Sequence, residues 1–192
     1  NGAADFSHEV YDAMAGCLVC KSCAGQCPVK VNVPEFRSRF LELYHQRYQR
    51  PLRDYLIGSL EFTMPWLARV PALYNRMMAA GWVRTLLERQ VGMVDSPLLS
   101  RFDLAAALRQ WRVRPADPNA LAALTDAQRA RSVVIVQDTF TRYFDTEQLA
   151  TLIELAARIG FQVWLAPLAP NGKALHVQGF LRAFERAAIR NP

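Results

Sequence analysis

Four cysteines lie close together near the start of the chain, and no other cysteine follows them. They are Cys17, Cys20, Cys23 and Cys27, separated by two, two and three residues, and Pro28 follows the last of them. Thiolates at this spacing can wrap a short loop around a cubane, so that each sulfur meets a different iron. The four cysteines therefore predict a [4Fe-4S] cluster, with all four as cluster-binding and metal-ligating residues.

Two other uses of clustered cysteines fit this spacing less well. A disulfide framework spreads its cysteines along the chain, because closing long loops stabilises more, and here every loop would be very short. Structural zinc sites take two Cys/His pairs from separated segments to close a tetrahedron, which three cysteines in succession do not supply. A structural zinc site in a protein-interaction module is the alternative interpretation.

The role of Cys27 is open at this point. In two-cluster ferredoxins the fourth cysteine of such a run ligates the other cluster. We therefore favour one cubane on the first three cysteines and a second, completed by ligands outside this sequence, on Cys27; the alternative is a single cubane closed by Cys27. Lys21 and Lys30 add positive charge that would raise a cluster's potential, although solvated surface lysines explain them equally well.

The composition is that of a globular chain. It has 192 residues, of which 52% are hydrophobic and 21% charged, enough for one domain or two small ones and too apolar for intrinsic disorder. We expect no transmembrane helix and no signal peptide, because the apolar runs stay below ~18 residues and the first residues lack a basic and an apolar region. The net charge of +6 is too small to indicate nucleic acid by itself.

Helices are predicted on both sides of the cysteine run. One covers residues 6–16, and a second runs over 32–50, where Asn32 and Glu35 make a start that resembles a capping box. His45 lies in the second helix, where we expect a packing residue rather than a proton or quinone contact. Four apolar residues of the second helix recur at helical spacing and are predicted to form its buried face: Phe36, Phe40, Leu43 and Tyr44.

The middle of the chain is helical and then irregular. Residues 52–90 keep a helical pattern with many aromatic residues beside arginines, which we interpret as helix packing or a subunit contact, with a membrane or quinone surface as the alternative. Residues 91–131 are irregular except for a helix from Leu104 to Trp111. Arginines around Trp111 carry no nucleic-acid module signature, so we expect a partner-facing patch and no specific nucleic acid.

The pattern changes at Ser132 to that of an α/β segment. Residues 133–136 form a continuous apolar run, typical of a strand buried on both faces. A helix over 145–159 and a second strand over 161–165 complete a β–α–β unit with a small parallel sheet, and another helix is predicted over 176–189. The predicted fold class is therefore mostly α, helical and ferredoxin-like, with a small C-terminal parallel α/β segment.

Three parts follow from these patterns. They are a ferredoxin-like cluster-binding segment (1–50), a helical extension and connector (51–131), and a partial α/β domain (132–192). No glycine-rich phosphate loop follows the first strand, which argues against a nucleotide site. Four polar residues lie where the strands end, at the place where α/β proteins form sites, although ordinary turn chemistry is the favoured interpretation. They are Asp138, Thr139, Asn171 and Lys173.

The segment from Cys17 to Glu35 resembles the second ferredoxin run of FAD-linked oxidases that are fused to iron–sulfur modules, as in D-lactate dehydrogenase, glycolate oxidase and D-2-hydroxyglutarate dehydrogenase proteins. The segment from Val133 to Leu168 is similar to the start of the cysteine-rich (CCG) domain that follows in such proteins. Where that domain has its Cys-Cys-Gly triplet, this sequence reads Ala-Pro-Asn-Gly-Lys over 169–173. The α/β segment therefore has no thiolates for a cluster of its own.

The resemblance implies a longer polypeptide in which an FAD domain oxidises a 2-hydroxy acid. It implies that clusters then carry the electrons to a quinone or another carrier. No FAD-domain signature is visible here, so this chain would be the electron-transfer part of an FAD-linked oxidoreductase and not catalytic alone. Its expected partners are an FAD-containing dehydrogenase domain or subunit and the acceptor. Its expected location is the cytoplasm, with peripheral attachment to the inner face of the membrane as a further option.

Overall fold

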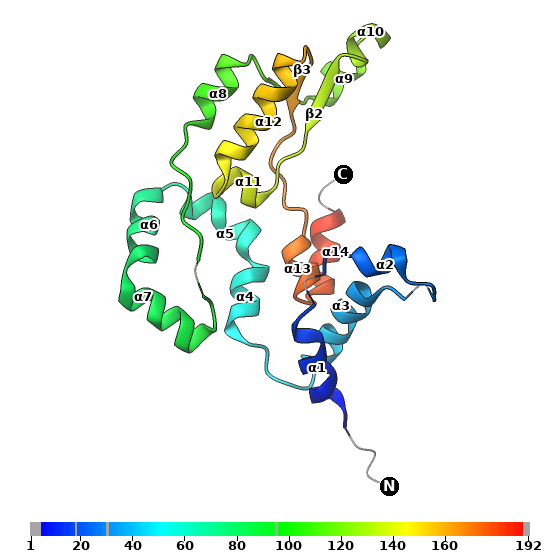
Figure 1. Ribbon diagram of the computed structural model, residues 1–192, viewed down its shortest axis with the longest axis vertical. Helices are drawn as coiled ribbons and strands as arrows, with labels where there is room; N and C mark the ends of the chain where they lie inside the picture. The colour runs from blue at the N-terminus through cyan, green and yellow to red at the C-terminus, as the bar shows by residue number, and fades with distance from the viewer. Residues whose placement is uncertain (1–4, 18, 30, 95, 190–192) are drawn as a thin grey trace. The chain divides into compact units, whose positions relative to one another are not determined.

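The computed structural model describes residues 5–17, 19–29, 31–94 and 96–189 (Figure 1). Within these residues the chain is mostly helical and contains one small, fully parallel, three-stranded sheet, which confirms the predicted fold class. The chain divides into two compact units, and the first joins residues up to Glu61 with residues from Asn171 onward. The second unit comprises the residues between them, 62–170. Among the described residues, no helix is both long and apolar enough to cross a membrane.

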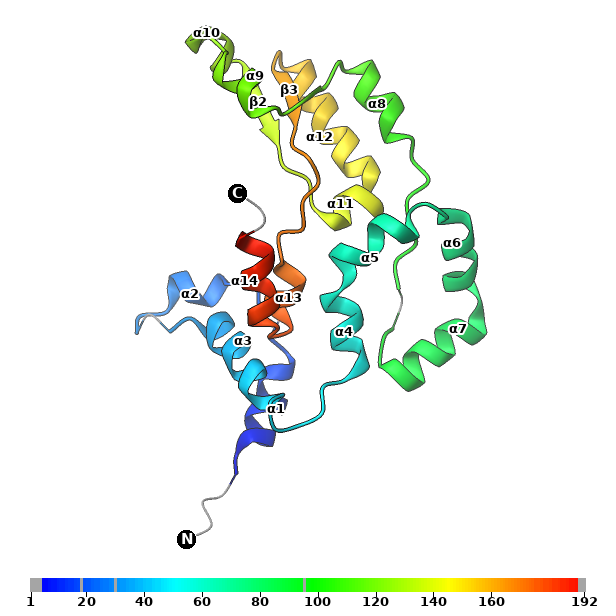
Figure 2. The ribbon, with the colours of Figure 1, turned by 180° about the vertical axis from the view of Figure 1, so that it is seen from behind.

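The first unit is entirely helical in its described part, and Figure 2 shows its helices from behind. Its helices are α1 (Ser7–Ala15), α2 (Ser22–Gln26), α3 (Val33–Tyr44), α4 (Leu52–Gly58), α13 (Lys173–Val177) and α14 (Leu181–Ile189). Helix α5 (Leu60–Leu67) crosses the boundary between the two units.

The second unit contains short helices and the sheet. Its elements are α6 (Pro71–Ala79), α7 (Gly81–Leu86), the π-helical turn η1 (Leu87–Val91), α8 (Leu104–Gln110), β1 (Arg114–Pro115), α9 (Pro118–Ala122), α10 (Asp126–Arg129), β2 (Ser132–Ile135), α11 (Thr139–Tyr143), α12 (Thr146–Arg158) and β3 (Gln162–Leu165). The helices predicted over 52–90 and 104–111 are confirmed. Strand β1 and helices α9, α10 and α11 were not predicted, because each covers five residues or fewer.

Helix α3 begins as predicted and ends earlier. The Asn32 side chain accepts a hydrogen bond from the Glu35 amide at 3.2 Å, which caps the helix. The helix stops at Tyr44 instead of Arg50, because the amides of both Arg47 and Tyr48 donate to the Tyr44 carbonyl at 3.0 Å and the regular ladder ends there.

The buried face of α3 differs from the predicted one. Its buried residues are Pro34, Ser38 and Leu41, whereas Phe36 and Leu43 are 50% and 62% exposed. The predicted face was wrong at these two positions because α3 packs against the α13–α14 pair, far along the chain, as well as against α1 and α2. Small and polar Ser38 is fully buried there, which hydrophobic periodicity does not indicate.

Gly179 explains both the close packing on α3 and the break between α13 and α14. Its φ of +68° is left-handed, and a Cβ there would lie 2.6 Å from Leu41 Cβ and 2.9 Å from the Ser38 carbonyl oxygen. The single helix predicted over 176–189 is therefore wrong, because the chain reverses at Gly179.

Charged side chains tie the α13–α14 pair to the first unit. Arg37 Nη1 donates to the Val177 carbonyl at 2.5 Å, and Arg50 donates to the Gln178 and Gly179 carbonyls. These bonds explain why residues from Asn171 onward belong to this unit, although the sequence pattern placed them with the α/β segment.

His45 is buried beside two charged residues, as expected for a packing histidine. Its side chain is 3% exposed, and its Nε2 lies 3.7 Å from Asp54 Oδ2. Burial, followed by the nearby Arg50 guanidinium, lowers the pKa of His45, so the neutral imidazole is favoured at this site.

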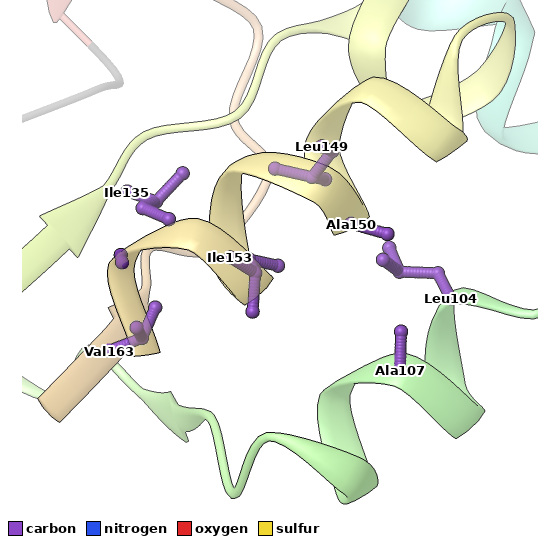
Figure 3. Packing of buried hydrophobic residues seen from close by; sticks show 8 residues of the cluster. Leu104, Ala107, Ile135, Leu149, Ala150, Ile153 and Val163 are labelled. Atoms are coloured by element: carbon purple, nitrogen blue, oxygen red, sulfur yellow. The ribbon is translucent and has the colours of Figure 1, made fainter. Parts of the chain in front are cut away.

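The second unit has the predicted β–α–β core. The strand order is β1-β3-β2, and Ile135 of β2 pairs in parallel with Leu165 of β3. Figure 3 shows the helices α12 and α8 packing together with the strands through these residues: Leu104, Ala107, Ile135, Leu149, Ala150, Ile153 and Val163. The prediction that β2 is buried on both faces was wrong, because Val134 is 43% exposed and Val136 80%.

Candidate metal centre

The cysteine run begins where α1 ends. The Cys17 amide donates to the Met14 carbonyl at 3.1 Å, and Arg37 Nε donates to the same carbonyl at 3.2 Å. Because Arg37 also bonds to Val177, one guanidinium joins the start of the run to α3 and α13. Charge-assisted bonds of this kind are stronger than neutral ones, so the first cysteine is held on the helical scaffold.

Two residues in left-handed conformation flank Cys20. Val19 has φ +54° and Lys21 has φ +62°, and Val19 is only 7% exposed. A β-branched residue at positive φ is an outlier, and each left-handed residue costs about 1–2 kcal/mol. Such strain concentrates at functional sites, and here it lies on both sides of Cys20. The sequence does not signal these turns, because neither position is Gly, Asn or Asp.

The environment of Cys20 favours its thiolate. The Ser22 amide, followed by the Ser22 hydroxyl, hydrogen-bonds to the sulfur and lowers the pKa of the Cys20 thiol. The thiolate is the form of cysteine that binds metal ions, so these bonds favour the form that a metal ligand needs.

Cys23 and Cys27 lie on one face of the short helix α2 and its end. The Cys27 amide donates to the Cys23 carbonyl at 3.0 Å, which sets the two residues one helical turn apart. Residues with this spacing are neighbours on a helix surface. The Val31 amide also donates to Cys27 Sγ at 3.4 Å, and hydrogen bonds to sulfur are one of the factors that tune iron–sulfur potentials.

All four thiols are free, and none is fully buried. Among the described residues, no three His, Cys, Asp or Glu side chains converge closely enough to hold a metal ion. The donor set nevertheless consists of sulfur alone, which suits an iron–sulfur cluster or zinc and not a hard cation. The chemistry of the cluster site therefore fits an iron–sulfur cluster in three respects: the thiols are free, hydrogen bonds at Cys20 favour its thiolate, and the Val31 amide donates to Cys27 Sγ.

The four polar residues predicted at the strand ends perform ordinary turn chemistry. Asp138 Oδ1 accepts hydrogen bonds from the amides of Phe140 at 2.7 Å and Thr141 at 3.0 Å, and so caps α11, in which Thr139 is buried. Asn171 Oδ1 accepts from the Lys173 amide at 2.8 Å. The two pairs belong to different units, so the structure does not assign them to one site. Lys30 lies outside the described residues.

A cavity of about 460 Å³ opens beside the cysteine run within the first unit. Val19, Cys20 and Lys21 line it from the run. The α13–α14 segment supplies the remaining lining residues, which are Asn171, Lys173, His176, Val177 and Phe184. Sequence reasoning missed this juxtaposition, because about 150 residues separate the two segments and no local pattern links them.

The chain is similar over almost its whole length to part of several larger enzymes. It is 68% identical over 190 residues to D-2-hydroxyglutarate dehydrogenase of Pseudomonas putida, which covers 99% of this chain and 19% of that protein. It is 48% identical over 187 residues to the enzyme of the same name from Escherichia coli, and 39% identical to that from Haemophilus influenzae. The chain thus spans about a fifth of the length of these curated relatives. No protein-family model matches it, and no solved structure does.

Proposed function

We propose that this chain is an iron–sulfur electron-transfer module. It relays electrons from a flavin-dependent 2-hydroxy-acid dehydrogenase, of the D-2-hydroxyglutarate type, to a downstream acceptor. The observation that carries the proposal is the run of four free thiols at ferredoxin spacing. The name shared by the relatives supports the oxidation of a 2-hydroxy acid as the source of the electrons.

The cysteines would hold a [4Fe-4S] cluster, with Cys17, Cys20 and Cys23 as ligands of one cubane and Cys27 as a ligand of the same cubane or of a neighbouring one. The cluster, when bound, supplies a store for one electron. The chain's own groups favour ligation, because hydrogen bonds from Ser22 lower the pKa of the Cys20 thiol and the Val31 amide donates to Cys27 Sγ.

The proposal implies two partners. The electron donor is an FAD-containing dehydrogenase domain or subunit, in line with the relatives, of which this chain matches only a fifth. The acceptor is a quinone or another carrier, which the protein would meet in the cytoplasm or at the inner face of the membrane. The relatives' names support a dehydrogenase as the partner. The FAD and the acceptor are proposed from the family resemblance alone.

Metal analysis tests the proposal directly. We would purify the chain without oxygen, measure iron, zinc and acid-labile sulfide, and record an EPR spectrum after dithionite reduction. About four irons and four sulfides per chain, with the signal of a reduced cubane, are expected if the four cysteines hold one cluster. Three irons or none, rising to four only in the longer flavin-containing protein, are expected if Cys27 serves a neighbouring cluster. Stoichiometric zinc without sulfide, also in protein from its native host, would refute the redox role and favour a structural zinc site.

Single cysteine-to-serine variants separate the two arrangements of ligands. Cys20→Ser is expected to remove the cubane signal in either arrangement. Cys27→Ser removes it only if Cys27 closes the same cubane, and leaves it if Cys27 serves a neighbouring cluster. Retention of a four-iron cluster in Cys20→Ser would contradict the assignment of this residue.

A further inference from the structure

The α13–α14 segment forms the wall of the cavity that faces Cys20. Lys21 and Cys20 line the cavity from the cysteine run, and Lys173, His176 and Phe184 line it from the other side. The residues from the α13–α14 side therefore combine the Lys173 cation with an imidazole and an apolar ring, beside Cys20. A positive, partly apolar surround is what an anionic cluster would experience on this side.

Lysine is rare in this chain, and two of its lysines line this one cavity. The chain has 23 basic residues, and only three of them are lysines: Lys21, Lys30 and Lys173. Two of these three line the same cavity, although 152 positions separate them (173 − 21). A lysine is a compact point charge with three donor hydrogens, and it suits an electrostatic role better than a bidentate contact.

The wall is fixed to the helix that follows the cysteine run. His176 Nε2 lies 3.3 Å from Glu35 Oε2, and Glu35 is held in turn by Arg39 Nε at 2.8 Å. At the start of the segment, the buried Glu61 carboxylate accepts a hydrogen bond from the Gly172 amide at 2.8 Å. Lys173 is the next residue after Gly172, so this hydrogen bond also fixes the backbone position of Lys173.

We propose that Lys173, acting together with Lys21 across this cavity, raises the reduction potential of the cluster bound at the cysteine run. The inference rests on the proposed function. An electron that arrives at the cluster adds one negative charge and no bond is made, so a nearby cation stabilises the reduced state more than the oxidised one. Lys173 is thus a potential-setting residue that the sequence places far from the metal site.

The test is an EPR-monitored redox titration of the anaerobically purified protein. Lys173→Met removes the charge and keeps most of the side-chain volume, and the reduction equilibrium is expected to shift threefold to tenfold toward the oxidised state. That shift is about 28–59 mV for one electron. Lys173→Glu doubles the change in charge and is expected to double the shift, while Lys173→Arg keeps the potential of the unmodified protein.

Arg182→Met is the matched control. Arg182 is an exposed residue of α14 that does not line the cavity, so the same loss of charge is expected to leave the potential unchanged. Equal shifts in Lys173→Met and Arg182→Met, or no shift in the former, would overturn the inference. Iron and sulfide contents, measured first, show whether each variant holds its cluster, and Lys21→Met replaces Lys173→Met if that variant does not.

The two proposals fail in different ways. A chain without iron and sulfide, in the longer flavin-containing protein as well, would overturn the proposed function, and this inference with it. A loaded cluster whose potential ignores Lys173 would overturn only the inference.

Discussion

Replacing Gly179 by alanine is the sharpest test of how the first unit is held together. The residue has a left-handed φ of +68°, and the new Cβ would lie 2.6 Å from Leu41 Cβ, 2.9 Å from the Ser38 carbonyl oxygen and 3.0 Å from the Glu42 amide nitrogen. Two of these three atoms belong to the α3 backbone and cannot rotate away. The α13–α14 pair must therefore move off α3.

The expected loss of stability has two parts. Left-handed alanine costs about 1–2 kcal/mol, and overpacking a buried contact costs about 1–3 kcal/mol. The sum is about 2–5 kcal/mol. With a urea dependence of about 2 kcal/mol per molar, the midpoint of the helical transition would fall by about 1–2.5 M. Circular dichroism of the apo-protein in urea measures this change.

Gly160→Ala is the control, because Gly160 has an even larger φ of +93° but a Cβ there would meet no described atom within 4 Å. Only the backbone cost of about 1–2 kcal/mol is expected for it. Tryptophan fluorescence adds a second control, since all four tryptophans lie in the second unit and report on Gly160 rather than on Gly179. Equal losses in the two variants would refute the packing argument.

Three further predictions concern groups within the first unit. Ser22→Ala is expected to raise the pKa of the Cys20 thiol, because a hydroxyl donor to the sulfur is lost; the pH dependence of alkylation of the apo-protein measures it, with the other three thiols as internal controls. Burial depresses the pKa of His45 in the folded state, so the unfolded chain binds more protons as the pH falls below the ordinary value of 6.5 and stability decreases there. Urea midpoints from pH 7 to pH 5 should show this decrease, and His45→Gln should weaken it; an equal pH dependence in both proteins would exclude the histidine as its source. Glu61→Ala is expected to destabilise the protein by about 1–3 kcal/mol, because the buried Gly172 amide loses its acceptor, whereas Glu61→Gln keeps one; equal urea midpoints for the two variants would argue against this bond.

Local signals in the sequence were sufficient for much of the fold. The cap at Asn32, the β–α–β pattern around α12 and the helical pattern over 52–90 each depend on residues a few positions apart, and each was predicted. The candidate site is likewise a local signal, because the cysteine spacing is contained within eleven residues, and the cluster itself stays a prediction. Short elements such as β1 and α9 carry too few residues for a periodic signal.

Other features depended on segments that meet only in the folded chain. The buried face of α3 is set by Gly179, and the exposure of Val134 depends on which face of the sheet the helices cover. Periodicity describes what a segment can bury, and it does not say which partner arrives. Val19 is a further example. Its buried side chain accompanies a left-handed backbone conformation that valine by itself disfavours, so the local sequence does not predict it.

The sequence by itself determined the cysteine run, the spacing of its thiols and the helices on either side, because those properties are local and chemical. The tertiary structure alone decided what surrounds them. It brought Lys173 and His176 to the cavity beside Cys20, and it anchored their segment through Arg37, whose hydrogen bond to the Val177 carbonyl spans 140 positions of the chain. Long-range contacts of this kind are selected by the combined burial and hydrogen bonding of the whole unit, and no short stretch of sequence encodes them.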